Sequence, residues 1–269
     1  MGAAGLHGAH ALSCGAGRGG PCRRCCHRGP RGRPGGRSTG RHALANGGGR
    51  MSRVLITPEA GGLRLALPGD AASLLLVPRL GLKLPRYHFR LGRVVHAAAE
   101  LDLFRVQTTL LLGNDHTGRA ELSDWRWAPA LEGAALTAAL GELIAAAQAR
   151  LRERPADFGD ALVAELPGWR DADGRSPFWQ ALGARFYNGD PAEAQARLGP
   201  DWRSHLAALL PRQTVYLSFL GAEAEARVLD VPAAWSPVRA ALTAAGFHPP
   251  AHARIDDGGP VLAWPVPPG

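Results

Sequence analysis

Residues 120–166 leave few folds open to this chain, because they read as a strand, a helix and a second strand. Residues 120–127 (AELSDWRW) have the composition of a strand, which Pro129 ends. From Gly133 to about Leu151 the apolar side chains recur at helical spacing and form one stripe: Leu136, Leu140, Leu143, Ile144, Ala147 and Leu151. Residues 160–166 (DALVAEL) have the length of a buried strand. This β-α-β unit predicts a mixed α/β fold.

Shorter elements flank this unit on both sides. Before it, we expect strands at 53–57, 63–67, 73–78 and 107–113, separated by segments that contain Gly and Pro. Residues 87–104 predict a strand followed by a short helical piece. After the unit we expect helices at 191–198, 201–210 and 222–229, an extended segment at 214–220, and a hairpin-like pair formed by 253–259 and 260–266.

Two further helices are indicated by a serine followed by a proline. Ser176 and Pro177 have the pattern of an N-cap and first helical residue, with Phe178, Trp179, Leu182 and Phe186 on the helix face. Ser236 and Pro237 repeat the pattern and predict a helix that reaches Ala245.

The first 50 residues differ in composition from the rest. They hold nine of the 31 Lys and Arg residues, none of the 23 acidic residues, and all four cysteines. The remainder has 22 basic and 23 acidic residues, so the pI of about 10.3 reflects the leader. A leader rich in Gly and Arg has too few aliphatic side chains to bury a core, and we expect it to be disordered.

The stretch CRRCCH (Cys22 to His27) leaves three interpretations of this leader open. A metal or haem site would need a second ligand pair or Cys-x-x-Cys-His spacing, and neither occurs. A targeting peptide would need a longer apolar segment. We favour a translation start at Met51, where ordinary protein composition begins. The expected organisation is a leader at 1–50 and one folded domain at 51–269.

Residues 51–269 are long enough for a domain with a sizeable core. They contain no cysteine, which suits a cytoplasmic protein, and no apolar run near the ~20 residues of a membrane span. Their nearly balanced charge lacks the basic face of a nucleic-acid-binding domain. We therefore expect a cytoplasmic protein that binds neither a membrane nor a nucleic acid.

Three polar stretches are candidate sites by residue type. In residues 114–118 (NDHTG), Asn, Asp and Gly are typical of a turn, and His116 is the residue that a turn does not require. Gly133 opens a helix whose free N–H groups suit a phosphate, although an ordinary helix start has the same pattern. Residues 173–186 and 256–260 read as core and turn. The sequence has no Ser-His-Asp spacing, phosphate loop or metal-ligand cluster.

Several longer strings, taken together, resemble the arginine N-succinyltransferase family. They are GRVVHAAAELDL, TTLLLGNDHTGRAEL, VAELPGWRDADGRSPFWQALGARFY, SPVRAAL followed by GF, and DDGGPVL, in the family's order and at nearly its spacing. The resemblance covers roughly residues 87–262. It implies a GNAT-like acyl-CoA transferase fold, a twisted mixed sheet flanked by helices. Residues 51–86 are too short for the family's opening strand-helix-helix-strand, so the first half should be abbreviated.

The resemblance implies a reaction. Succinyl-CoA, the acyl donor, would give its succinyl group to the α-amino group of arginine or a related amine, without a metal. The amine must be neutral to attack the thioester. The thioester oxygen needs hydrogen-bond donors as charge develops, and the departing CoA thiolate needs a proton.

The resemblance also assigns roles by position. The strand that pairs with the pantetheine arm corresponds to Leu122–Trp127, with Trp125 at the succinyl-CoA position, and the pyrophosphate loop corresponds to Gly133, Ala134 and Ala135. The family's proton-donor histidine falls at Pro232, counted without gaps between Tyr216 and Pro237. Because proline cannot donate a proton, we expect His116 or His96 to replace it. The substrate-binding candidates are Asn114, Asp115, Glu121, Ser176, Phe178 and Trp179.

Two classes of function remain open. The chain is either an arginine N-succinyltransferase-type enzyme, or a degenerate relative that serves as a non-catalytic partner subunit or ligand-binding module of a full-length paralogue. In either case we expect a homo- or hetero-oligomer.

Overall fold

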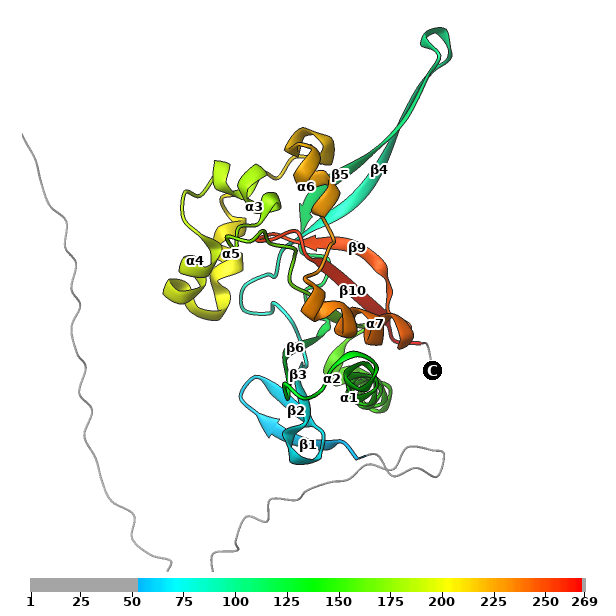
Figure 1. Cartoon of the computed structure of the whole chain (residues 1–269), viewed down its shortest axis with the longest axis vertical. Helices are drawn as coiled ribbons and strands as arrows, with labels where there is room; N and C mark the ends of the chain where they lie inside the picture. The colour runs from blue at the N-terminus through cyan, green and yellow to red at the C-terminus, as the bar shows by residue number, and fades with distance from the viewer. Residues whose placement is uncertain (1–52, 268–269) are drawn as a thin grey trace, which may run out of the picture. The chain divides into compact units, whose positions relative to one another are not determined.

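The computed structural model describes residues 53–267, and the predictions for residues 1–50 lie outside this range. Ten strands of the described residues form one sheet (Figure 1) in the order β1-β2-β3-β6-β7-β10-β9-β4-β5-β8. Their bounds are β1 Leu55–Glu59, β2 Gly62–Ala66, β3 Ala72–Val77, β4 His88–Ala98, β5 Leu103–Gly113, β6 Ala120–Trp127, β7 Ala161–Glu165, β8 Val215–Tyr216, β9 His248–Arg254 and β10 Pro260–Pro265. The mixed α/β expectation is confirmed.

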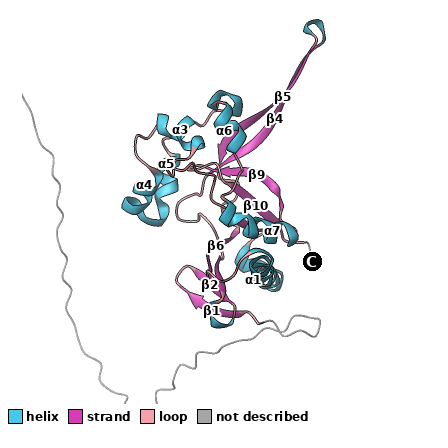
Figure 2. Ribbon diagram, viewed as in Figure 1, coloured by secondary structure: helices cyan, strands magenta, loops and turns pink. Residues whose placement is uncertain are grey.

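Helices connect and flank these strands (Figure 2). The α-helices are α1 Gly133–Glu153, α2 Pro155–Phe158, α3 Pro177–Ala181, α4 Pro191–Leu198, α5 Trp202–Ala207, α6 Ala222–Arg227 and α7 Ser236–Ala244. The 3-10 turns are η1 Pro68–Asp70, η2 Ala99–Leu101, η3 Gly183–Arg185, η4 Gly199–Asp201, η5 Leu217–Leu220 and η6 Ala233–Trp235. Within the described range, no helix has both the length and the apolar character needed to cross a membrane.

The β-α-β unit is present as predicted, from β6 through α1 to β7. β6 and β7 form a parallel pair, and every other strand pair in the described sheet is antiparallel. The parallel pairing covers only Ala120–Leu122 of β6 and ends where Leu122 faces Ala164. Beyond that point β6 continues for five residues without β7 beside it, so the two strands diverge.

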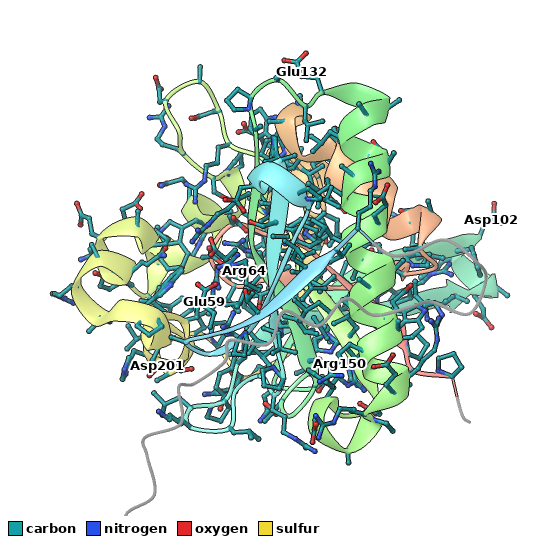
Figure 3. All side chains as sticks on the ribbon, turned by 90° about the horizontal axis from the view of Figure 1, so that it is seen from below. Glu59, Arg64, Asp102, Glu132, Arg150 and Asp201 are labelled. Atoms are coloured by element: carbon teal, nitrogen blue, oxygen red, sulfur yellow. The ribbon has the colours of Figure 1, made fainter. Side chains whose placement is uncertain are left out.

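A bulge in β6 determines which side chains lie beside this divergence. Asp124 has a φ of 45°, and the pairing with β3 shifts register between Ser123 and Arg126. One extra residue on the bulged strand places Trp125 on the same face as Leu122. Arg64 holds the bulge, because its side chain donates to the Asp124 carbonyl oxygen at 3.0 Å and also pairs with Asp124 and Glu59. Figure 3 shows Arg64 beside Glu59.

Two hydrophobic clusters make up the core. In the first, α1 and α7 pack on the face of the sheet that carries Leu122 and Trp125. The second joins the base of β4 and β5 to α3–α5 through Phe89, Leu110, Phe178 and Trp202. α1 therefore covers one face beside the divergence, while the other face is left to the polar side chains of β6 and β7.

Three local predictions need correction. The extended segment at 214–220 is wrong in its second half, because only Val215–Tyr216 forms a strand and a 3-10 turn follows. Ser176 caps α3 as predicted, accepting a hydrogen bond from the Trp179 N–H at 3.2 Å, but α3 ends at Ala181 and Phe186 is exposed. Ser236 is the first residue of α7 rather than its cap, because the preceding turn η6 runs directly into the helix.

Candidate functional site

Two carboxylates lie where β6 and β7 diverge. Side chains alternate along a strand, so Glu121 points away from the face that carries Leu122 and α1. Glu121 pairs in register with Val163, and Glu165 lies two residues further along β7, so both carboxylates share one face. The side chains of Glu121 and Glu165 are 8% and 6% exposed.

Basic side chains from distant segments surround Glu165. The Arg86 guanidinium donates to its Oε1 at 2.8 Å and lies 3.6 Å from Glu121. Arg203 of α5 approaches Oε2 at 3.2 Å, and His88 Nε2 lies 2.9 Å from Oε1. Glu165 therefore receives close contacts from three basic side chains, whereas the closest printed contact of Glu121 is Arg86 at 3.6 Å.

This difference separates the pKa values of the two carboxylates. Burial, followed by repulsion from Glu165, raises the pKa of Glu121 to about 7. Burial alone would raise the pKa of Glu165 as well, but Arg86, Arg203 and the hydrogen bond from His88 hold that pKa well below its usual range. Glu165 stays ionised, while Glu121 can gain and lose a proton near neutral pH.

The turn between β9 and β10 extends the buried network. Arg254 pairs with Asp256 at 2.6 Å and with Asp257 at 3.1 Å, and Arg203 bridges Asp256 to Glu165. Gly168, just after β7, lies very close to this turn. A Cβ atom on residue 168 would be 2.2 Å from the Asp257 carbonyl oxygen, so the position requires glycine. The sequence pattern predicted a turn here, and the structure adds that its acids are buried.

Three histidines connect this network to the NDHTG turn. The His88 ring lies 5.2 Å from the His116 ring, and the His116 ring lies 4.3 Å from that of His252. His252 Nε2 lies 2.9 Å from Asp115 Oδ2 in the same turn. Residues 114–118 form the predicted turn, and His88 and His252 join its Asp115 and His116 to Glu165.

His116 should remain neutral across the physiological pH range. Burial, and then the neighbouring His88 and His252, lower its pKa to about 3, below the ordinary value of 6.5. We expect its ring signals in histidine-selective NMR to show no titration between about pH 5 and 8, with a His116→Asn variant to assign them. A midpoint inside that range would contradict this environment.

The depressed His116 pKa also has a consequence for stability. The unfolded chain binds a proton at His116 as the pH falls below 6.5, whereas the folded chain does not, so this residue lowers stability on acidification. Its Nδ1 lies 2.9 Å from the Arg119 guanidinium and must accept that hydrogen bond. The proton is then on Nε2, which has no hydrogen-bond partner among the described residues.

A cavity of about 750 Å³ lies between the segment after β7, the loop following α6, and α7. Its lining includes Trp169, Arg227, Asp230, Val231 and Arg239, and no histidine of the described chain. Pro232 follows Val231 of this lining and is the N-cap residue of the turn η6. The histidine position that the family resemblance assigns to Pro232 is thus beside the cavity.

Trp125 and the start of α1 are the two other features near the divergence. Trp125 packs against the first core cluster, and its indole N–H is buried without a partner in the described chain. Gly133, Ala134 and Ala135 open α1 on an exposed surface, with no side-chain cap and a φ of 52° at Gly133. Figure 3 shows Glu132 at this end of the helix.

The remaining predicted site residues lie elsewhere. Ser176 is the α3 cap and donates to the Asp257 carbonyl oxygen at 3.3 Å, and Phe178 and Trp179 are buried in the second cluster. Asn114 is exposed, and its carbonyl accepts from the Thr117 N–H. His96 lies on the β4–β5 hairpin, 5.8 Å from the Tyr216 ring. No group of described His, Asp and Glu side chains is arranged to hold a metal ion.

The network residues that sequence reasoning missed are Arg86, His88, Glu165, Arg203, His252 and Arg254. They come from the loop before β4, from β4 and β7, from α5 and from β9. These residues do not form a recognisable sequence motif. The one sequence feature that could have indicated the site was the presence of polar residues, without another explanation, at the ends of buried strands.

The mixed sheet, with one short parallel β-α-β pair that diverges and α1 behind it, defines an α/β protein. Residues 72–267 match the family model described as the arginine N-succinyltransferase beta subunit. The chain belongs to the arginine N-succinyltransferase family, as the sequence resemblance predicted.

Individual relatives agree with this assignment. The arginine N-succinyltransferases of Salmonella arizonae and Salmonella paratyphi B are each 37% identical over 187 residues, which are 68% of this chain and 52% of those proteins. Arginine/ornithine succinyltransferase subunit AI from Pseudomonas aeruginosa has a similar fold, with a TM-score of 0.59 and 24% identity over 83% of this chain and 62% of that one. The chain spans about half the length of the curated relatives it matches.

Proposed function

We propose that this chain transfers a succinyl group from succinyl-CoA to the α-amino group of arginine or a related amine. The observation that carries the proposal is the pair of buried carboxylates at the β6–β7 divergence, of which Glu121 has a pKa raised to about 7. A general base is most effective when its pKa lies near the working pH, and an attacking amine has to lose a proton.

Glu121 is the group that takes this proton. The amine nitrogen attacks the thioester carbonyl carbon, the C–S bond breaks, and the nitrogen loses one proton to Glu121. The CoA thiolate takes up one proton as it leaves, so the protonated Glu121 can return to its starting state. Ionised Glu165 keeps the pKa of Glu121 high. Arg86, 3.6 Å from Glu121, limits that rise.

In this proposal the acyl donor lies along the edge of β6 that is free of β7, at the divergence where Glu121 lies. The five residues of β6 beyond Leu122 would offer backbone groups to the amides of the pantetheine arm, the role that the family resemblance implies for Leu122–Trp127. Trp125 then donates its unpartnered indole N–H to a carbonyl oxygen of the donor. The exposed N–H groups of Gly133–Ala135 suit the pyrophosphate, because a helix start favours anions.

His116 acts through its neighbours in this proposal. His88 separates it from Glu165, so His116 serves as a positioning residue that maintains the orientation of His88. His96 lies on the hairpin, where it could affect the reaction only if a further chain segment meets it. Proton return to sulfur therefore falls to Glu121.

A second function is favoured by Pro232 beside the cavity. A chain without an acid at that position can bind the acyl-CoA and stabilise a full-length paralogue without turning over. This alternative predicts succinyl-CoA binding without thiol release.

The test uses the full chain with succinyl-CoA and arginine, measuring binding by calorimetry and transfer by thiol release. Binding with arginine-dependent thiol release supports the enzyme, and binding alone supports the partner-subunit alternative. Trp125→Phe, which removes one donor and keeps most of the ring, should raise the Kd for succinyl-CoA about 5- to 10-fold.

Trp264→Phe is the matched control for Trp125→Phe. Trp264 packs in the same core cluster but lies on β10 and stacks with Arg152, so its substitution should leave the Kd for succinyl-CoA unchanged. Equal Kd changes in both variants, or none in either, would remove Trp125 from the donor site.

A further inference from the structure

A second cavity, of about 410 Å³, lies beside the loop that precedes β4, and we call it the basic cavity. Its lining comes from the β1–β2 turn, the end of β3, residues 79–86, and η4 with α5. Val77 of this lining is directly opposite Glu121 in the β3–β6 ladder, so the two side chains share a face. Arg86, also in the lining, lies 3.6 Å from Glu121. The basic cavity is therefore on the Glu121 side of the sheet, opposite α1.

Positive charge exceeds negative charge in this lining. It holds Arg79, Lys83 and Arg86, against the single acid Asp201. Arg86 is already paired with Glu165. Arg79 and Lys83 are exposed, and neither forms an ion pair within residues 53–267. Two cations of the basic cavity are thus available to an anionic group of a ligand.

Asp201 adds a negative charge to the same lining. It lies at the end of η4, directly before α5 (Figure 3). A polyanion such as phosphate would be repelled by Asp201, whereas a zwitterion with a second cationic group can satisfy both signs of charge. The lining also includes the apolar side chains of Val77, Leu82 and Leu84, which suit methylene groups. A volume of about 410 Å³ is within the range of sites for small molecules.

We propose that the basic cavity binds the acceptor amino acid, with its carboxylate at Arg79 and Lys83 and the cationic end of its side chain at Asp201. The α-amino group and the carboxylate are bonded to the same carbon atom, so a carboxylate held here keeps the attacking nitrogen on the face where Glu121 lies. This inference rests on the proposed succinyl transfer and specifies its acceptor as an α-amino acid with a cationic side chain. Arg79 and Lys83 are then specificity-determining residues, because an amine without a carboxylate lacks the group that they bind.

The first test compares arginine with agmatine, which is arginine without its carboxylate, by calorimetry of the full chain with and without CoA. Wild-type protein should bind arginine more tightly than agmatine. Arg79→Gln combined with Lys83→Met should raise the Kd for arginine about 10-fold, because two ion pairs are lost. The Kd for agmatine should stay unchanged or fall. A general structural defect would weaken the binding of both ligands, so the difference between them reports on the carboxylate.

Arg185→Gln is the matched control for Arg79→Gln. Each of these arginines is exposed and donates to a backbone carbonyl oxygen, Arg79 to that of Ala156 and Arg185 to that of Ala181. Arg185 lies outside the lining of the basic cavity, so its substitution should leave both Kd values unchanged. Asp201→Asn tests the other end of the ligand. It should reduce the preference for arginine over citrulline, whose side chain is neutral.

Lys83 offers a direct readout, because it is the only lysine in the sequence of 269 residues. Reductive methylation with isotope-labelled formaldehyde retains the charge and labels Lys83 and the N-terminal amine. In NMR spectra of the labelled full chain, arginine should shift the Lys83 signal more than agmatine does at the same concentration. A larger shift with inorganic phosphate than with arginine would assign the basic cavity to another anion and overturn the proposal.

These measurements separate the acceptor site from the transfer reaction. Arginine binding that depends on Arg79 and Lys83, without thiol release, would support the basic cavity as an amino-acid site and reject the transfer. Arginine-dependent thiol release with an unchanged KM for arginine in the Arg79→Gln, Lys83→Met variant would support the transfer and reject the cavity as the acceptor site. Equal binding of arginine and agmatine to the wild type, or no arginine binding with or without CoA, would also overturn the proposal.

Discussion

Replacing Glu121 with Gln should lower kcat for succinyl transfer by about 100-fold or more, because it removes the base that the attacking amine needs. Glutamine has the size of glutamate and matches its protonated form, which burial already favours at this site. The substitution should therefore leave the fold and the Kd for succinyl-CoA unchanged. Both are measured alongside the rate, by circular dichroism and calorimetry.

The pH profile of kcat gives a second readout of the same group. Burial and Glu165 raise the pKa of Glu121 to about 7, so the wild-type rate should rise as the pH increases through that value and the carboxylate ionises. Glu121→Gln should remove this inflection along with the activity.

Glu153→Gln is the matched control, because Glu153 is an exposed residue near the end of α1 whose one ion pair within residues 53–267 is with Arg150. It should keep both the wild-type rate and the wild-type pH profile. A Glu121→Gln enzyme with wild-type kcat would reject Glu121 as the base, while leaving open transfer by another group at the divergence.

Local patterns in the sequence were enough to predict the elements around this site. The apolar stripe from Leu136 to Leu151 predicted α1, and the strand at 120–127 was predicted with the bounds that the structure shows. These predictions succeed because each element buries one face, and burial of one face imposes a period on the sequence. At 214–220, where only two residues form a strand, the composition was misleading.

The site was less visible, because its contacts join segments that are far apart in the sequence. Glu121 was singled out from the family resemblance, but its partner Glu165 looked like the polar end of a buried strand. Arg86 lies 79 residues from the Glu165 that it contacts. Nothing in the spacing of either residue indicates that pairing. Register between β6 and β7 brings the two carboxylates to one face, and register is a property of the folded sheet.

The β4–β5 hairpin is an intermediate case. The sequence predicted its strands and the short helical piece at its tip, now β4, β5 and η2. It did not reveal that most of the hairpin lacks other neighbours, because Val95 and Phe104 have the same residue types as core positions. Exposure decides between core and contact surface, and only the fold supplies it.

Replacing Arg254 with Met should lower the free energy of unfolding by about 3–5 kcal/mol, measured by urea denaturation at neutral pH. Arg254 is the cation that pairs with both Asp256 and Asp257, and all three side chains are at least 87% removed from solvent. Methionine keeps much of the side-chain volume but leaves two buried carboxylates with a single remaining guanidinium, from Arg203. An uncompensated buried charge is costly, because the lost hydration is not replaced.

Arg254→Met should also change how the free energy of unfolding depends on pH in the acidic range. Despite burial, Arg203 and Arg254 hold the pKa of Asp256 below the ordinary 3.8. A lowered carboxylate pKa stabilises the fold above the unfolded value, and that contribution is lost as the pH falls through the folded value. Wild-type stability should therefore decline below about pH 4. Arg254→Met should show a shallower decline, since part of this contribution is already missing at neutral pH.

Arg154→Met separates the effect of the buried network from the loss of any arginine. Arg154 pairs with Asp157 at 3.0 Å, but both side chains are at least half exposed, so its substitution should change stability by no more than about 1 kcal/mol. Adding Asp256→Asn to Arg254→Met should recover part of the lost free energy of unfolding, because it removes a buried carboxylate that has lost one of its cationic partners. If Arg254→Met cost no more than Arg154→Met, the buried charges at the β9–β10 turn would have to be solvated in some other way, and the ionic network beneath Glu165 would lose its structural role.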